Sequence, residues 1–72
     1  MDAYEKLANA IVLSAVADYR TALKSLARNP DGKYASTDTE ILERFFRSGW
    51  YSVLTSVDGE MLIRKLREEA GL

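Results

Sequence analysis

Carboxylates are the side chains of this sequence that could perform acid–base chemistry, because the chain contains no histidine and no cysteine. Glu40 and Glu43 fall on one face of a predicted helix, and Glu68 is followed directly by Glu69. A carboxylate pair can supply a general acid and a general base. Glutamates four residues before arginines also have a structural role, worth roughly 0.3 kcal/mol per pair on a helix. The chain offers three such pairs: Glu40–Arg44, Glu43–Arg47 and Glu60–Arg64.

The missing residue types exclude several classes of site. Without His and Cys there is no imidazole base, no thiolate nucleophile, no disulfide and no Cys/His metal site. The four glycines are isolated from one another, so the sequence has no glycine-rich phosphate loop. We therefore expect a non-enzymatic protein that uses neither a metal ion nor a cofactor.

Basic residues gather late in two predicted helices. They are Arg20, Lys24, Arg28, Arg64, Lys65 and Arg67. Helix dipoles favour cations at C-termini, so this placement requires no ligand. Ten Lys and Arg against eleven Asp and Glu give a formal charge of −1, which argues against a nucleic-acid partner. Two alternatives stay open: a DNA-binding regulator, and an oligomer that binds a small phosphorylated ligand, such as a nucleotide, through Arg20, Lys24 or Arg47.

Aromatic residues beside cationic ones predict a partner-binding surface, since these residue types dominate binding hot spots. Trp50 and Tyr51 follow Arg47 closely, and Lys33 precedes Tyr34 in a predicted loop. We predict that these five residues contact a partner. The alternative places Trp50 in the core between the last two helices and packs Tyr34 over the first helix.

The first long element is a helix over residues 2–28, a segment that lacks Gly and Pro and is rich in Ala and Leu. At about 100° per residue, its apolar residues fall on one side. They are Tyr4, Ala8, Ile11, Ala15, Tyr19, Ala22 and Leu26, with Val12, Val16 and Leu23 beside them. Asn29-Pro30 ends the helix, because the residue before proline avoids the α region.

A loop over residues 29–36 and a second helix follow. Thr37 to Glu40 has the pattern of a capping box, which predicts that the helix starts there. Gly49 ends or kinks it. The apolar face of this helix carries Ile41, Leu42, Phe45 and Phe46.

Residues 50–57 allow two interpretations. Their strand-like composition before Asp58-Gly59 is typical of a β-hairpin. Alternatively, Asp58 is the N-cap of a last helix that ends at Gly71, and the preceding stretch is a short helix or turn. We favour the last helix, because Leu62, Ile63, Leu66 and Ala70 cluster on one helical face.

These elements predict an all-α, single-domain protein over residues 1–72, with one long N-terminal helix packed by two shorter helices. A chain of this size rarely gains more than about 3–5 kcal/mol from its core. The first helix would be about 40 Å long, more than the shorter helices can cover side by side. We therefore expect self-association, most simply as a two-fold antiparallel dimer; the alternative is a three-helix monomer. The self-association residues would be Tyr4, Ala8, Ile11, Ala15, Tyr19 and Ala22.

The sequence also bears on localisation. No apolar stretch approaches the roughly 20 residues that span a bilayer, so we expect no membrane partner. Residues 1–6 lack the basic and apolar regions of a signal peptide. The absence of cysteine fits a reducing compartment, and we expect a cytoplasmic protein.

The middle of the chain resembles a known group of proteins. The resemblance is carried by Phe45-Phe46-Arg47-Ser48-Gly49-Trp50-Tyr51, Leu54-Thr55, Asp58-Gly59-Glu60 and Leu62-Ile63. These motifs, within residues 41–67, resemble small uncharacterised proteins of prophages and mobile elements in Gram-positive bacteria. The resemblance assigns no functional residue, but it implies a mobile-element context in which small helical oligomers often block or regulate host proteins. We therefore expect an interaction module, such as a phage-type regulator or counter-defence protein, that binds a host protein.

Overall fold

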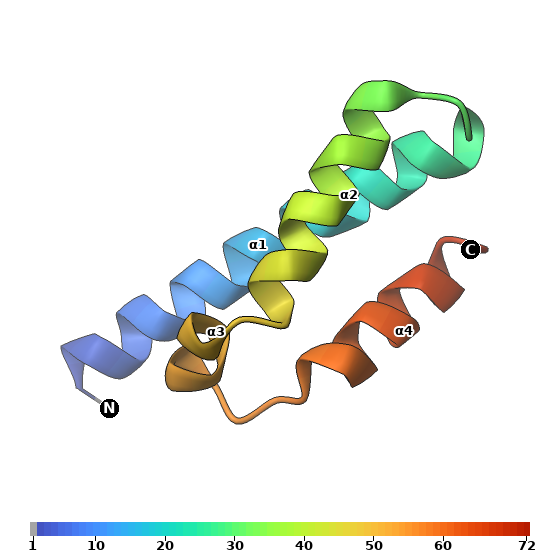
Figure 1. The fold of residues 1–72 in the computed structure, drawn as a ribbon. Coiled ribbons are helices and arrows are strands. Elements are labelled where there is room, and N and C mark those ends of the chain that lie inside the picture. Colours follow the sequence, from blue (N-terminus) through green and yellow to red (C-terminus); the bar gives the residue numbers. More distant parts are fainter. Residues whose placement is uncertain (1) are drawn as a thin grey trace.

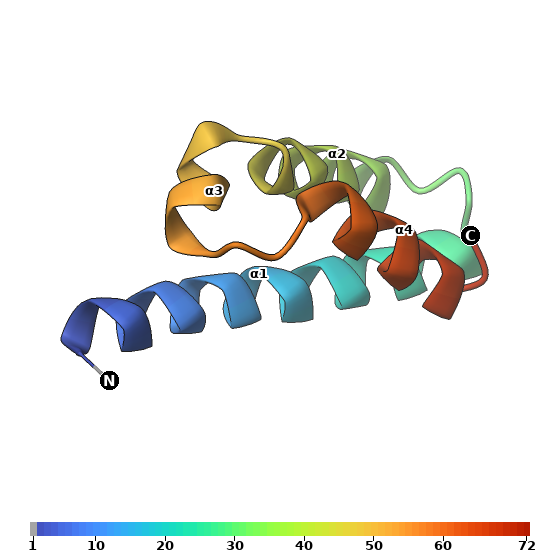
Figure 2. The same ribbon diagram turned by 90° about the horizontal axis from the view of Figure 1, so that it is seen from below.

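Four helices make up the fold. The computed structural model describes residues 2–72, which form α1 (Ala3–Arg28), α2 (Lys33–Phe46), α3 (Gly49–Leu54) and α4 (Gly59–Glu69) and contain no β-strand. α2 folds back along the C-terminal half of α1, α3 lies over the N-terminal half, and α4 runs beside the C-terminal half (Figures 1 and 2). The predicted class, an all-α bundle with one long first helix packed by shorter ones, is confirmed, with three shorter helices where two were predicted.

α1 begins and ends where its local sequence predicts. The Asp2 carboxylate caps the first turn by accepting a hydrogen bond from the Glu5 N–H at 2.8 Å. The helix stops at Arg28, because Pro30 disfavours the α conformation for Asn29, whose φ of −139° and ψ of 84° lie outside the helical region. Both ends therefore follow from residues next to them in the chain.

α2 starts one turn earlier than predicted. It begins at Lys33, so the predicted loop over residues 29–36 shrinks to residues 29–32. The predicted capping box is wrong: Thr37 lies inside the helix, and no side chain caps the N-terminus of α2. The earlier start buries Ala35 in the interior. Packing against the rest of the chain, which local capping patterns do not report, accounts for the longer helix.

One residue of the predicted apolar face of α2 points away from the core. Phe46 is buried, and Leu42 and Phe45 pack against the core, but Ile41 is 55% exposed. Ile41 lies about 140° around the helix from Phe46 at 100° per residue. The side of α2 that packs on the rest of the chain is too narrow to include it.

Residues 49–54 form a helix, so the hairpin interpretation is wrong and the short-helix interpretation is confirmed. The Ser48 hydroxyl caps α3 by accepting a hydrogen bond from the Tyr51 N–H at 3.1 Å. Gly49, predicted to end or kink the second helix, is instead the first residue of α3, and α2 already ends at Phe46.

α4 has the predicted ends. Asp58 is its N-cap, and the Asp58 carboxylate accepts a hydrogen bond from the Glu60 N–H at 3.0 Å. Gly71 follows the helix with a φ of 82°, a left-handed conformation that favours glycine. At the start of α4, a Cβ atom on Gly59 would lie 2.0 Å from the Phe46 carbonyl oxygen. The start of α4 can therefore approach the end of α2 this closely only because residue 59 has no side chain.

The core lies against the C-terminal half of α1. Its buried cluster draws on all four helices and consists of Tyr19, Leu23, Phe46, Tyr51, Ile63 and Leu66. The ring of Phe46 is central, with edge-to-face contacts to Tyr19 at 5.4 Å and Tyr51 at 5.6 Å between centroids. The molecule measures 42 × 19 × 18 Å, because α1 extends well past this core.

Candidate functional site

Exposed apolar side chains gather where the N-terminal half of α1 meets α3. Tyr4 is 85% exposed, Trp50 is 60% exposed and Val53 is 76% exposed. Between the two helices lies a groove of about 500 Å³. Its lining residues are Tyr4, Glu5, Leu7, Ala8, Asn9, Ile11, Trp50, Val53 and Leu54. We call this surface the α1–α3 groove, and Glu5 is the charged residue that lines it.

The rotation of α3 about its own axis decides which aromatic residue faces the groove. Trp50 and Tyr51 are consecutive on the helix and so point about 100° apart. The Tyr51 ring is buried, with edge-to-face contacts to Phe45 and Phe46. Trp50 consequently faces outward, and the alternative that it fills the core is wrong. The prediction of Tyr51 as a partner-contacting residue needs correction as well, since its side chain is only 3% exposed.

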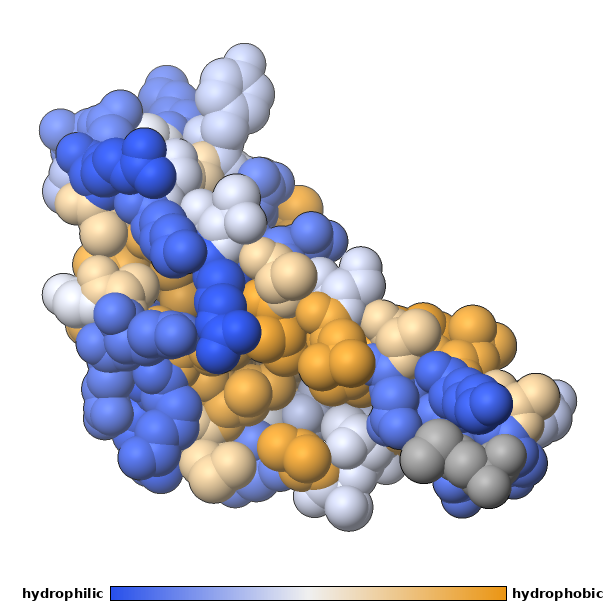
Figure 3. Space-filling view, turned by 180° about the vertical axis from the view of Figure 1, so that it is seen from behind, coloured by the Kyte–Doolittle hydropathy of each residue, from blue (hydrophilic) through white to orange (hydrophobic). Residues whose placement is uncertain are grey.

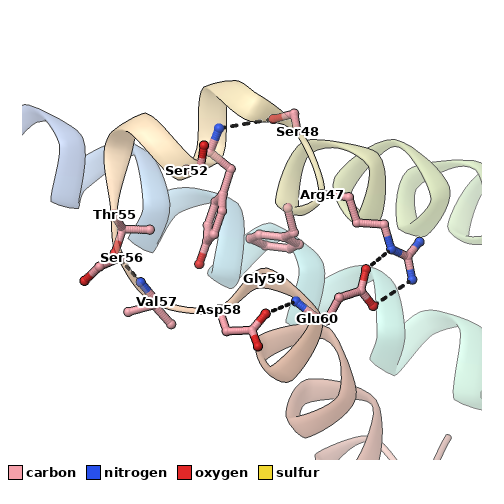
Figure 4. A pocket seen from close by; sticks show the side chains of 11 residues that line it. Arg47, Ser48, Ser52, Thr55, Ser56, Val57, Asp58, Gly59 and Glu60 are labelled. Atoms are coloured by element: carbon pink, nitrogen blue, oxygen red, sulfur yellow. Dashed lines mark hydrogen bonds and ion pairs between the residues drawn. The ribbon is translucent and has the colours of Figure 1, made fainter.

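Arg47 is engaged within the chain. Its Nη2 donates to Glu60 Oε2 at 3.4 Å, and its Nε also donates to the Glu60 carboxylate (Figure 4). Its Nη1 lies 3.6 Å from Glu43 Oε1. The hydrogen bond that Arg47 donates to the Glu60 carboxylate raises the pKa of Arg47. Of the three predicted helical pairs, Glu43–Arg47 forms, whereas Arg44 and Arg64 make no ion pair in the described part of the chain. Arg47 therefore ties the start of α4 to the end of α2.

Lys33 and Tyr34 lie far from the α1–α3 groove. They occupy the first turn of α2, at the opposite end of that helix from Arg47. Tyr34 is 91% exposed, so the alternative that it packs over α1 is wrong. It borders a separate hollow of about 470 Å³ against the C-terminal half of α1, near Asp18. The structure thus separates the five predicted partner-binding residues into four places: the groove, the core, the contact of α2 with α4, and the first turn of α2.

The residues of α1 predicted for self-association are likewise separated, because only some of them are exposed. Tyr19 and Ala22 are buried by the chain itself, and Ala15 packs against the core, so these three residues are not free to meet a second copy. Ala8 and Ile11 are half-buried beside α3, and Tyr4 is exposed. The first helix is therefore covered by its own chain at one end and open at the other.

The most buried carboxylate belongs to a structural network. Glu43, whose side chain is 13% exposed, accepts hydrogen bonds from the Tyr19 hydroxyl at 2.6 Å and from Arg67 Nε at 3.0 Å. Burial, and then the hydrogen bond to Glu43, raise the pKa of Tyr19 well above its usual range. Because Tyr19 therefore keeps its proton at neutral pH, it cannot act there as a general base. The network joins α1, α2 and α4 through polar groups at the edge of the core.

The cations proposed for a phosphorylated ligand are engaged with carboxylates or lie apart. Arg20 Nε pairs with Glu69 Oε2 at 3.0 Å, and Arg47 pairs with Glu60 at the other end of α4. Lys24 lies beside Arg20 in a hollow of about 70 Å³. Among residues 2–72, no cluster of three or more acidic side chains is arranged to hold a metal ion. Within the same range, no helix has the length and apolar composition needed to cross a membrane.

A polar hollow of about 410 Å³ lies between α3, residues 55–58 and the start of α4 (Figure 4). Two of its hydroxyl groups are used locally: Ser52 donates to the Gly49 carbonyl, and Thr55 accepts from the Val57 N–H. Tyr51 contributes a buried hydroxyl that has no hydrogen-bond partner among the described residues. Ser52, Thr55 and the capping Asp58 thus stabilise the turns around the hollow.

The sequence reasoning missed Val53, Leu54 and Leu7 as surface residues of the α1–α3 groove. Trp50, Val53 and Leu54 are spaced i, i+3 and i+4, which places them on one face once the segment is known to be a helix. The signal was therefore present, but the strand-like composition of residues 50–57 obscured it.

Comparison with known proteins gives no further indication of function. No family model matches the chain, and no curated protein or solved structure is significantly similar to it. The resemblance of residues 41–67 to proteins of mobile elements stays a prediction.

Proposed function

We propose that this chain is a non-enzymatic interaction module that binds an amphipathic helix of a partner protein in the α1–α3 groove. The single observation that carries the proposal is the concentration of exposed Tyr4, Trp50 and Val53 around a groove of about 500 Å³. Exposed apolar groups gathered in one hollow mark interaction sites in small monomeric proteins. A groove between two helices fits the apolar face of a third helix.

The chemistry of the α1–α3 groove defines the partner segment. Large apolar side chains at i, i+3 or i+4, and i+7 of the incoming helix would occupy the groove. Glu5 at its edge favours a Lys or Arg beside those anchors. With the mobile-element context that the central motifs imply, the proposed partner is a host protein whose helix is covered and so blocked.

A pair of matched variants tests the proposal. In Val53→Lys a charge replaces a side chain that is 76% exposed in the groove, so partner capture should fall by at least tenfold with little change in stability. Ile41→Lys places the same charge at a 55% exposed position on α2, outside the groove, and should capture partners normally. The measurement compares the amounts of host proteins that the immobilised wild type and each of the two variants retain. Equal retention by all three would reject the α1–α3 groove as the binding surface.

Trp50 provides a direct optical test, because it is the one tryptophan of the chain. Its indole is 60% exposed and should emit as a solvated tryptophan in the free protein. Addition of the retained partner should shift the emission to shorter wavelength as the groove closes over the indole. An unchanged spectrum at saturating partner would contradict the proposed position of the bound helix.

A further inference from the structure

A single buried side chain connects α3 to the core. Figure 3 shows hydrophobic residues gathered in the middle of one face of the molecule, with hydrophilic clusters toward both ends. α3 lies away from the middle, over the N-terminal half of α1 (Figures 1 and 2). Of its six residues, Tyr51 alone belongs to the buried cluster, and Leu54 is half-buried at the α1–α3 groove. The packing of α3 on the rest of the chain therefore depends mainly on Tyr51.

Polar side chains do not tie α3 to the other helices. The hydroxyls of Ser48 and Ser52 donate to carbonyl groups only three residues earlier in the chain. In the described part of the chain, no ion pair or side-chain hydrogen bond joins α3 to α1, α2 or α4. α4 differs, because it forms ion pairs with α1 and α2 through Glu60, Arg67 and Glu69. α3 is thus the helix with the fewest links to its neighbours.

The side chain that anchors α3 also carries an unfavourable group. Edge-to-face contacts with Phe45 and Phe46 hold the Tyr51 ring, but its hydroxyl is buried without a hydrogen-bond partner among the described residues. Buried polar groups are normally hydrogen-bonded, because an unpaired one costs the free energy of removing it from water. That cost disappears when the ring leaves the core and the hydroxyl meets water. The hydroxyl of Tyr51 therefore opposes the docking that its ring stabilises.

Hollows on two sides of α3 leave room for it to move. Trp50 and Val53 line the α1–α3 groove of about 500 Å³, whereas Tyr51 and Ser52 line the polar hollow of about 410 Å³. At the start of the helix, a Cβ atom on Gly49 would meet no atom within 4 Å. A tilt of α3 that carries the Tyr51 ring toward the polar hollow therefore brings its hydroxyl to water.

We infer that α3 is a movable wall of the α1–α3 groove, which exchanges between a docked position with Tyr51 in the core and an undocked position with the Tyr51 hydroxyl in water. The rest of the buried cluster belongs to α1, α2 and α4, which keep a shared core when α3 undocks. Segments that adjust to ligands come from the least stable parts of a fold. A bound helix contacts Trp50 and Val53 and so selects the position of α3 that fits it. This selection rests on the proposed function, whereas the opening of α3 in the free protein does not.

Amide hydrogen exchange of the free protein measures the opening. The Thr55 N–H at the end of α3 bonds to the Tyr51 carbonyl at 3.2 Å, and the Arg47 N–H at the end of α2 bonds to the Glu43 carbonyl at 3.1 Å. The two amides occupy the same position on their helices, so fraying of helix ends affects both. Under native conditions, Thr55 should be less protected than Arg47 by at least about tenfold, because α3 opens alone. Equal protection would overturn the inference, since α3 would then open only with the whole fold.

Tyr51→Phe tests the role of the hydroxyl. The variant keeps the ring in the core and removes the unpaired group, so exchange of the Thr55 amide should slow by about tenfold. Tyr34→Phe is the matched control, because it removes a hydroxyl from a ring that is 91% exposed, and it should leave Thr55 exchange unchanged. Unchanged or faster exchange in Tyr51→Phe would show that the hydroxyl does not oppose docking and would overturn the inference.

A partner protein retained by the immobilised chain supplies the last measurement. At saturation it should slow Thr55 exchange in the wild type by at least about tenfold, because the bound helix holds α3 through Trp50 and Val53. A retained partner that leaves Thr55 exchange unchanged would overturn the selection of the α3 position. Retention by Val53→Lys equal to that of the wild type would instead reject the proposed function, while the opening measured in the free protein would stand.

Discussion

The two halves of α1 share one apolar pattern and have opposite surroundings. Tyr19 and Leu23, in the C-terminal half, have no exposed surface, whereas Tyr4, on the same apolar side in the N-terminal half, is 85% exposed. α2 and α4 both pack on the C-terminal half, and the other half is left with the six residues of α3. Apolar spacing therefore identifies the side of a helix that avoids water. The length of the remaining chain determines how much of that side is covered.

The largest expected effect contrasts two leucines of α1. Leu23→Ala opens a cavity in the buried cluster and should lower the free energy of unfolding by about 2–5 kcal/mol, enough to unfold much of a domain this small. Leu7→Ala removes a side chain that is 59% exposed and should change the free energy of unfolding by less than about 0.5 kcal/mol. Urea unfolding at low protein concentration, where self-association does not contribute, measures both. Similar losses for the two variants would show that the two halves of α1 are equally buried.

A second contrast uses two glycines that begin helices. Gly59→Ala puts a Cβ atom 2.0 Å from the Phe46 carbonyl oxygen, so α4 must shift at a cost of about 1–3 kcal/mol in unfolding free energy. Gly49→Ala meets no atom within 4 Å and should be neutral or stabilise by up to about 1 kcal/mol, because alanine restricts the unfolded chain. Thermal unfolding of both variants gives the sign of each change. A stabilising Gly59→Ala would show that α4 does not need its close contact with α2.

The smallest of the three effects concerns two tyrosines. Tyr19→Phe removes the hydroxyl that donates to Glu43 and should cost about 1–2 kcal/mol at neutral pH, whereas Tyr4→Phe should have no measurable effect. Burial and Glu43 raise the pKa of Tyr19. The folded chain therefore holds this proton more tightly than the unfolded chain, in which tyrosine has a pKa of about 10.

The sign of the pH dependence follows from that difference. The contribution of Tyr19 to stability is complete below about pH 10 and is lost as the pH rises above it. The unfolding free energy of the wild type should fall above that pH more steeply than that of Tyr19→Phe. Burial also raises the pKa of Tyr51, so the variant should keep part of the fall. Parallel curves for the wild type and Tyr19→Phe would exclude this contribution.

Features that depend on neighbouring residues follow directly from the order of amino acids. Asp2 and Asp58 cap helices with their own side chains, Pro30 ends α1, and Gly71 takes the left-handed conformation that follows α4. The spacing of its apolar residues also predicts which side of α1 avoids water. The segment around Trp50 is predicted as a candidate site, because tryptophan is a residue type that dominates binding hot spots.

Which of these groups are covered depends on how the four helices pack together. The start of α2 at Lys33, the inward turn of Tyr51 and the pairing of Arg47 with Glu60 depend on segments that meet across the fold. The same is true of the division of α1 into a buried and an open half. Hydrogen-bonded caps and turns involve groups a few residues apart, so a linear sequence contains them. Burial is a property of the whole chain, because it depends on where every other segment lies.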